Sequence, residues 1–146
     1  MPGRMSVRIQ RALAVAGALA LSACKSPPKP YAPAPPRTHA NGLVVQTLRP
    51  GDGPGIEAGD KISVHFVGSL EDGGVFDNSR QRRAPFDFRV GRGHVIAGWD
   101  EGLLGAREGE VRLLTLPPEL AYGSDSKKGI PPHSTLTFEI EILDVD

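Results

Sequence analysis

The stretch VIAGWDEGLLG, residues 95–105, holds Trp99, the only tryptophan of the chain. Within it Ile96, Trp99 and Leu103 fall at positions i, i+3 and i+7, which lie on one side of an α-helix. Asp100 falls on the opposite side. The stretch therefore predicts a short amphipathic helix, and it is the only helix that we expect in the folded part of the chain.

Segments of alternating apolar residues on either side of this helix predict strands. In residues 61–70, Ile62, Val64 and Phe66 share one face. The other expected strands lie in residues 42–53, 75–79, 83–91, 110–117 and 134–145. Such alternation is typical of an antiparallel sheet with one buried face. A sheet with one apolar face and a single helix to cover it is an α+β fold.

The helical period alone leaves two interpretations of Trp99. It can be a core residue between helix and sheet, which the period by itself favours, or it can contact a ligand. Gly98 precedes the tryptophan and Gly102 follows it by three residues. The largest apolar side chain therefore lies on a segment whose glycines lower its helix propensity.

The composition excludes several classes of protein. A chain of 146 residues is long enough for one domain, and 17 basic against 17 acidic residues leave no positive excess for a nucleic acid. The histidines His39, His65, His94 and His133 are scattered, and we expect them at the surface. A single cysteine excludes a disulfide within the chain. The sequence thus predicts no metal, no cofactor and no nucleic-acid partner.

Residues 1–23 have the pattern of a signal peptide. Three arginines precede the apolar run ALAVAGALAL at 12–21, which is too short to span a bilayer. The run ends in LSAC, which resembles a bacterial lipobox and implies cleavage before Cys24 with lipid on that cysteine. The alternative is an ordinary secretory signal that leaves Cys24 free.

Residues 24–41 follow as the lipidated cysteine and a linker. The run KSPPKPYAPAPPR at 25–37 is rich in proline and predicts an extended spacer, with a docking motif for an aromatic groove as the alternative. Lys25 after the cysteine resembles lipoproteins sorted to the outer membrane of a Gram-negative cell. The expected location is therefore the bacterial cell envelope, on the periplasmic side of the outer membrane if the host is Gram-negative. The folded domain is expected at 42–146.

Three motifs within 42–146 resemble those of the FKBP-type peptidyl-prolyl cis–trans isomerase family. They are SVHFVGSLEDGGVFDNS (63–79), VIAGWDEGLLG (95–105) and LAYG…IPPHSTLTFEIEILDV (120–145). The resemblance implies a five-stranded antiparallel sheet wrapped around one short helix. It also implies rotation about X-Pro bonds of polypeptide substrates, and macrolides as inhibitors.

By the same resemblance Trp99 forms the floor of an apolar pocket for a prolyl ring, and the glycines beside it leave room for the ligand. Tyr122 offers its hydroxyl to one substrate carbonyl, and the backbone N–H of Ile96 donates to another. The implied catalytic residues are Asp77, Trp99, Tyr122 and Phe138. The implied substrate-binding residues are Phe66, Phe76, Arg82, Phe86, Val95, Ile96 and Ile130.

Two departures from the family pattern affect this expectation. Phe66 stands where the pattern has Tyr, so a hydroxyl is lost that would restrain Asp77, and affinity for macrolides is expected to fall. The loop SDSKKG at 124–129 looks short and carries Lys127 and Lys128, which leaves the substrate preference open.

Three functions remain open at this point. The expected one is an isomerase that assists the folding of exported proteins, and the second is a binding module with little turnover. The third is a general chaperone, but only six residues separate Gly123 from Ile130, too few for the apolar flap of some relatives. Other relatives dimerise through a long N-terminal helix, which the proline-rich segment cannot form, so we expect a monomer.

Overall fold

The computed structural model describes residues 32–127 and 129–146. The expected signal peptide, Cys24 and Lys128 therefore lie outside the described residues. The elements of the described part are, in chain order, β1 (Arg37–Thr38), β2 (Val44–Arg49), β3 (Lys61–Leu70), β4 (Val75–Asn78), β5 (Phe86–Arg89), α2 (Ala97–Gly102), β6 (Val111–Leu116), the 3-10 helix η1 (Pro118–Leu120) and β7 (Leu136–Val145). No helix among these is long and apolar enough to cross a membrane.

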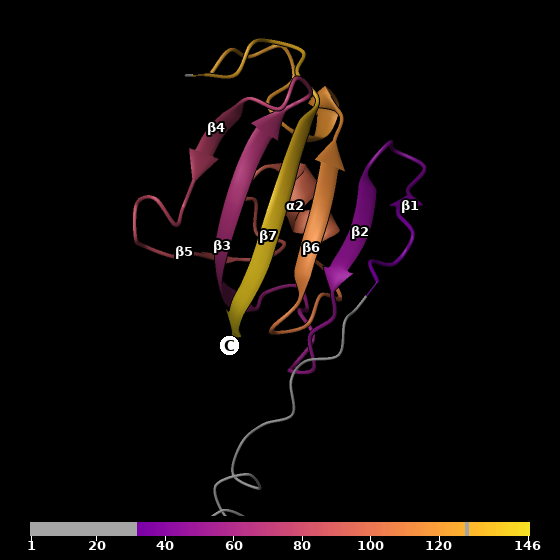
Figure 1. The fold of residues 1–146 in the computed structure, drawn as a ribbon, viewed down its shortest axis with the longest axis vertical. Coiled ribbons are helices and arrows are strands. Elements are labelled where there is room, and N and C mark those ends of the chain that lie inside the picture. The colour runs from indigo at the N-terminus through magenta and orange to yellow at the C-terminus, as the bar shows by residue number, and fades with distance from the viewer. Residues whose placement is uncertain (1–31, 128) are drawn as a thin grey trace, which may run out of the picture. The chain divides into compact units, whose positions relative to one another are not determined.

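The strands form one antiparallel sheet in the order β1-β2-β6-β7-β3-β4 (Figure 1). The ten-residue strands β3 and β7 lie at its centre and pair along almost their whole length, with Phe66 opposite Ile140. The bounds of β3 are those expected from the alternation. Its apolar residues Ile62, Val64 and Phe66 are all buried, which confirms the face that the sequence assigns to the core.

The strand count differs from the expected five because one edge of the sheet is interrupted. β4 and β5 both pair with β3, β4 along residues 67–69 and β5 along residues 61–64. Residues 79–85 between them leave the sheet in turns, so one edge position is divided into two short strands. The α+β fold with a single short helix against an antiparallel sheet is confirmed.

The remaining extra strand is β1, which lies within the segment expected to be linker. Its two residues pair with Val44 and Val45 of β2. The N–H of Ala34 also donates to the carbonyl of Thr47 at 3.0 Å. The described residues of the linker are therefore joined to the edge of the sheet by backbone hydrogen bonds.

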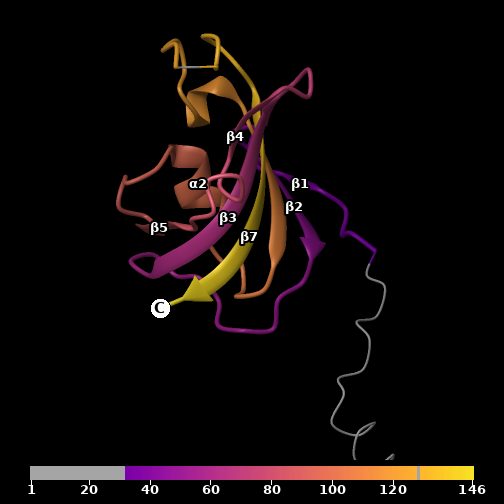
Figure 2. The same ribbon diagram turned by 60° about the vertical axis from the view of Figure 1, so that its left-hand side comes forward.

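Helix α2 lies against one face of the sheet (Figure 2), and the glycines bring it close to β6. A Cβ atom added to Gly98 would lie 2.3 Å from the Leu116 side chain, and one added to Gly102 would lie 2.9 Å from Leu114. Both distances are too short for real contacts. The expectation that these glycines leave room for a ligand is therefore wrong: their missing side chains make room for two leucines of the sheet.

The C-terminal end of α2 is tied to β6 by a nearly buried ion pair. Arg112 donates through Nε to Glu110 at 2.7 Å, and through Nη1 to the carbonyls of Gly102 and Leu104 at 3.0 and 3.2 Å. The side chains of Arg112 and Glu110 are only 13% and 6% exposed. Thr47 of β2 also donates to Glu110. This network fixes the C-terminal end of α2, the helix on which Trp99 lies.

Candidate active site

Trp99 stands at the centre of a cluster of aromatic rings. Its ring centroid lies 5.0 Å from that of Phe66 and 5.2 Å from that of Phe138, and both pairs meet edge to face. This geometry suits the ring quadrupoles. The side chain is 4% exposed, and its indole N–H has no acceptor among the described residues. Apolar contacts therefore hold the ring in place.

The ring cluster opens into a cavity of about 230 Å³. Trp99 is buried in the core, which confirms the first interpretation, and it also lines this cavity, so contact with a ligand stays a prediction. Among the described residues the lining consists of Phe66, Phe76, Asp77, Arg82, Phe86, His94, Val95, Ile96, Trp99, Tyr122 and Phe138. We call this space the aromatic cavity.

The structure thus brings together all the site residues implied by the resemblance except Ile130. Ile130 is buried in the core, 6% exposed, and is not among the residues that line the aromatic cavity. His94 is the residue that the sequence analysis missed. It is exposed, as expected of a scattered histidine, yet it lies at the rim because it directly precedes Val95 and Ile96.

Two hydrogen-bond donors at the aromatic cavity have no acceptor within the described part of the chain. They are the backbone N–H of Ile96, just before α2, and the hydroxyl of Tyr122. Burial raises the pKa of the Tyr122 hydroxyl above its usual value, and the negative charge of Asp77 raises it further. Tyr122 therefore stays protonated and able to donate at neutral pH.

Asp77 is restrained although residue 66 has no hydroxyl. Arg82 donates to the Asp77 carboxylate, and the guanidinium carbon of Arg82 lies 5.7 Å from the centroid of the Phe66 ring. A cation over an aromatic face is attracted to the ring quadrupole. Phe66 therefore supports the partner of Asp77 instead of bonding Asp77 itself, and Asp77 lacks the hydroxyl contact that a Tyr at position 66 would supply.

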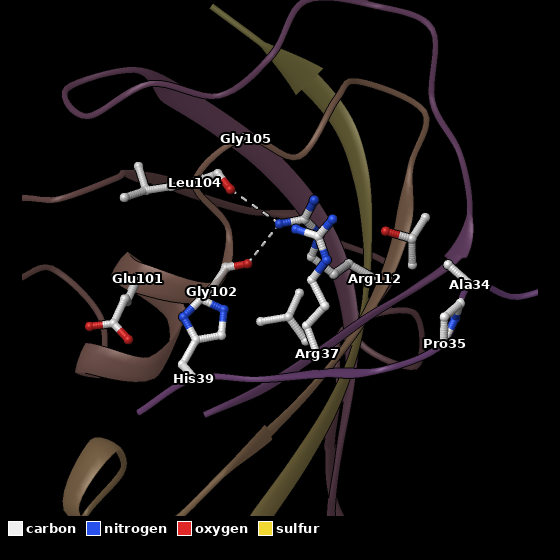
Figure 3. Close-up of a pocket in the computed structure, with 11 residues that line it drawn as sticks. Ala34, Pro35, Arg37, His39, Glu101, Gly102, Leu104, Gly105 and Arg112 are labelled. Carbon is white, nitrogen blue, oxygen red and sulfur yellow. Dashed lines mark hydrogen bonds between the residues drawn. The ribbon is translucent and has the colours of Figure 1, made fainter. Parts of the chain in front are cut away.

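A second cavity, of about 390 Å³, lies between β1, β2, β6 and the C-terminal end of α2 (Figure 3). We call it the polar cavity. Arg37 and Arg112 point into it, and Arg112 donates to the carbonyls of Gly102 and Leu104. Because Arg112 also pairs with Glu110, this arginine already serves to hold the helix. The aromatic cavity combines apolar walls with donors that have no acceptor among the described residues, and it is the better candidate for a functional site.

The aromatic cavity is suited to an apolar ring flanked by carbonyl groups. Its walls are mainly aromatic and aliphatic, and its free donors lie on two different segments. Within residues 32–127 and 129–146 no group of three or more His, Cys, Asp or Glu side chains is placed to hold a metal ion. A prolyl ring between two peptide carbonyls fits this arrangement of apolar walls and donors.

Comparison with known families gives one clear match. The family model for FKBP-type peptidyl-prolyl cis-trans isomerases matches residues 53–143. The matched range includes every residue that lines the aromatic cavity.

Curated relatives agree with the family model. The chain is 48% identical over 105 residues to FK506-binding protein from Neisseria meningitidis serogroup B, which covers 71% of this chain and 96% of the relative. It is 47% identical over 107 residues to peptidyl-prolyl cis-trans isomerase Fkbp12 from Drosophila melanogaster, covering 72% and 99%. Other relatives are much longer: the chain spans 28% of FK506-binding protein 4 from Mycosarcoma maydis, at 45% identity over 105 residues and 72% of this chain.

Two solved structures share the fold. The structure of AtFKBP13 has a TM-score of 0.71 and 39% identity, covering 77% of this chain and all of that one. The structure of FkpA from Escherichia coli has a TM-score of 0.71 and 44% identity, covering 76% of this chain and 51% of that one.

Proposed function

This chain belongs to the FKBP-type peptidyl-prolyl cis–trans isomerase family, and from that premise we propose that it accelerates rotation about X-Pro bonds in exported polypeptides, with the aromatic cavity as its active site. The observation that supports this site is the combination of an apolar, ring-lined cavity with two donors that have no acceptor among the described residues, the Ile96 N–H and the Tyr122 hydroxyl.

The reaction needs a site that binds a twisted amide better than a planar one. Rotation about a peptide bond has a barrier of about 18–20 kcal/mol because resonance gives the C–N bond partial double-bond character. Before proline the two planar isomers differ by only about 0.5–1 kcal/mol, yet they exchange over tens to hundreds of seconds. No covalent bond has to break, so catalysis requires only tighter binding of the transition state.

An apolar cavity supplies this preference. The twisted amide has lost its resonance and is less polar than the planar amide, so it gives up less hydration when it enters the aromatic cavity. A thousandfold acceleration requires about 4 kcal/mol of differential binding. Only those ring contacts and hydrogen bonds that are stronger with the twisted amide than with the planar one contribute to this difference.

Each part of the site has a proposed role. Trp99 forms the floor beneath the prolyl ring, and Phe138 and the other rings form the walls. Tyr122 and the N–H of Ile96 hold the carbonyl groups on either side of the ring, so that the chain turns around the X-Pro bond. Asp77, held by Arg82, supplies a fixed negative charge at one side of the cavity. The same cavity is the proposed site for macrolide inhibitors.

The test uses residues 24–146 with Cys24→Ser, which lacks the lipid but keeps β1. Exchange NMR would measure the cis–trans rate of a short X-Pro peptide with the wild-type chain and with Trp99→Leu and Asp77→Ala. We expect clear acceleration that both substitutions reduce, while the circular dichroism spectrum shows that they remain folded. A folded wild-type chain without acceleration would contradict the proposal and indicate a binding module that holds proline without turnover.

We also propose that a lipid on Cys24 anchors the protein in the bacterial cell envelope. The proposal is supported by the LSAC motif after the apolar run, and two acyl chains are enough for stable membrane binding. Cys24→Ser is expected to move the protein from the membrane fraction to the aqueous fraction. Unchanged fractionation would overturn the anchor and leave the isomerase proposal untouched.

The protein is proposed to act as a monomer on its tether. Light scattering of the unlipidated chain is expected to give the mass of one copy. A stable dimer at micromolar concentration would contradict this.

A further inference from the structure

The loop that follows Tyr122 places a cation beside the aromatic cavity. The ammonium nitrogen of Lys127 lies 5.6 Å from the centroid of the Tyr122 ring, and Tyr122 lines the cavity. Backbone hydrogen bonds join Lys127 and Ile130 in both directions, at 3.1 and 2.8 Å, and Gly129 between them has a φ of +80°. The backbone of Lys127 is therefore held by its two hydrogen bonds with Ile130.

No acidic side chain neutralises Lys127 within the part of the chain that the structure describes. Lys127 makes no ion pair there, including with Asp125 of the same loop. Among the described residues that line the aromatic cavity, Asp77 is the only acidic one, and it is already paired with Arg82. The positive charge of Lys127 beside the Tyr122 ring therefore has no ion-pair partner in the described part of the chain.

We propose that Lys127 is a specificity-determining residue, which favours X-Pro substrates that carry an acidic side chain next to the proline. This rests on the proposed isomerase function. With the prolyl ring on Trp99 and a flanking carbonyl at the Tyr122 hydroxyl, the neighbouring residue of the substrate lies at the rim, within reach of the flexible ammonium group. An exposed ion pair of this kind is worth about a two- to fivefold preference at low salt.

The experiment compares peptides that differ only in charge. One pair has Glu or Gln directly before proline, and a second pair has Glu or Gln directly after it. Exchange NMR measures the catalysed rate constant of each peptide with residues 24–146 carrying Cys24→Ser. In at least one pair we expect the Glu peptide to be turned over about two- to fivefold faster at low salt, and the ratio to approach one at about 1 M salt, where charges are screened.

Two variants test whether the charge of Lys127 causes this ratio. Lys127→Gln is expected to bring the Glu/Gln ratio to about one, and Lys127→Glu is expected to reverse it. Lys61→Gln is the matched control, because it changes the net charge equally at an exposed position beside the C-terminal Asp146, at the other end of the sheet (Figure 1). It should leave the ratio unchanged.

A merely structural role for Lys127 gives a different result. If Lys127 only supports the Tyr122 ring, Lys127→Gln changes the rate of all peptides by the same factor and the ratio stays as in the wild type, which would overturn the proposal. A wild-type ratio of one in both peptide pairs would also overturn it.

Failure of the isomerase proposal can be told apart from failure of this one. If the wild type accelerates no peptide, the proposed activity is wrong. The charge preference is then measured as the ratio of dissociation constants for the Glu and Gln peptides, from NMR chemical-shift titration. Equal affinities in both pairs would overturn the role of Lys127 independently.

Discussion

The two ends of helix α2 face cavities of opposite character. At the N-terminal end Ile96 and Trp99 line the aromatic cavity, where two donors have no acceptor among the described residues. At the C-terminal end Gly102 and Leu104 line the polar cavity, where the donors of Arg112 are occupied by the helix carbonyls and by Glu110. The larger of the two cavities, about 390 against about 230 Å³, is thus the one that contains the network holding the end of the helix.

This difference separates a cavity that stabilises the fold from a cavity that is open to a ligand. Size alone points to the polar cavity, whereas the apolar walls and the two donors without an acceptor among the described residues point to the aromatic one. A polar group that is already paired gains little from a ligand, because the new bond replaces an existing one. The comparison therefore predicts that substitutions in the Arg112 network change stability, and that substitutions of the residues lining the aromatic cavity change activity.

The largest effect is expected for Arg112→Met. It leaves the nearly buried Glu110 without its charge partner, and breaking such a pair costs about 3–5 kcal/mol of unfolding free energy. Urea unfolding of the unlipidated chain measures this cost. Arg49→Met is the matched control, since Arg49 pairs with Glu141 but is 55% exposed, and it should cost at most about 1 kcal/mol. Equal losses of unfolding free energy in the two variants would show that the Arg112 network stabilises the helix no more than an exposed ion pair does.

A second, smaller effect is expected for Gly98→Ala. The added Cβ would lie 2.3 Å from Leu116, and the overpacking costs about 1–3 kcal/mol of unfolding free energy. Gly55→Ala serves as the control, because a Cβ there would meet nothing within 4 Å. If Gly98→Ala and Gly55→Ala unfold at the same urea concentration, this result would contradict the close approach of α2 to β6.

The third variant, Asp100→Ala, tests the loop that leads into the aromatic cavity. The Asp100 carboxylate accepts the backbone N–H groups of Gly91 and Gly93 at 2.8 and 3.0 Å, just before His94 and Val95. We expect a loss of about 1 kcal/mol in unfolding free energy, together with a higher KM at a similar kcat. Glu101→Ala, which removes only an exposed contact with Asn41, should change neither value. An unchanged KM in Asp100→Ala would mean that the loop does not need this anchor.

The smallest effect is on the pH dependence of stability. The pKa of Tyr122 is raised in the folded chain, so the folded state holds this proton more tightly than the unfolded state. The stability from the protonated hydroxyl is fully present below the ordinary tyrosine pKa of about 10, and it is lost as the pH rises through the higher folded-state value. Between about pH 8 and about pH 11 the wild type should therefore lose more unfolding free energy than Tyr122→Phe. Equal losses would contradict the raised pKa.

Much of the fold could be predicted from local pattern. The period of two in residues 61–70 gave β3 and its buried face, and the spacing of Ile96, Trp99 and Leu103 gave the helix. Pattern of this kind shows which face of an element is buried. It does not show how closely two elements approach, so the contact of Gly98 with Leu116 could not be foreseen.

The candidate site could be predicted mainly through the family motifs, and what was missed depends on long-range contacts. Arg112 reaches carbonyls eight and ten residues earlier in the chain, and no periodicity indicates such a contact. Ile130 follows a loop, where the motif fixes the residue type but not the direction of its side chain. The pairing of β1 with β2 involves only two residues, too few for an alternating pattern.

The contact between Gly98 and Leu116 has a consequence for how this sequence can change over time. The two residues share one volume between helix and sheet, so a larger side chain at 98 can be accepted only with a smaller one at 116. Each substitution alone leaves either a clash or a void, and neither single intermediate is neutral. Descendants of this chain should therefore inherit the pair as a unit, and exchange both residues or neither.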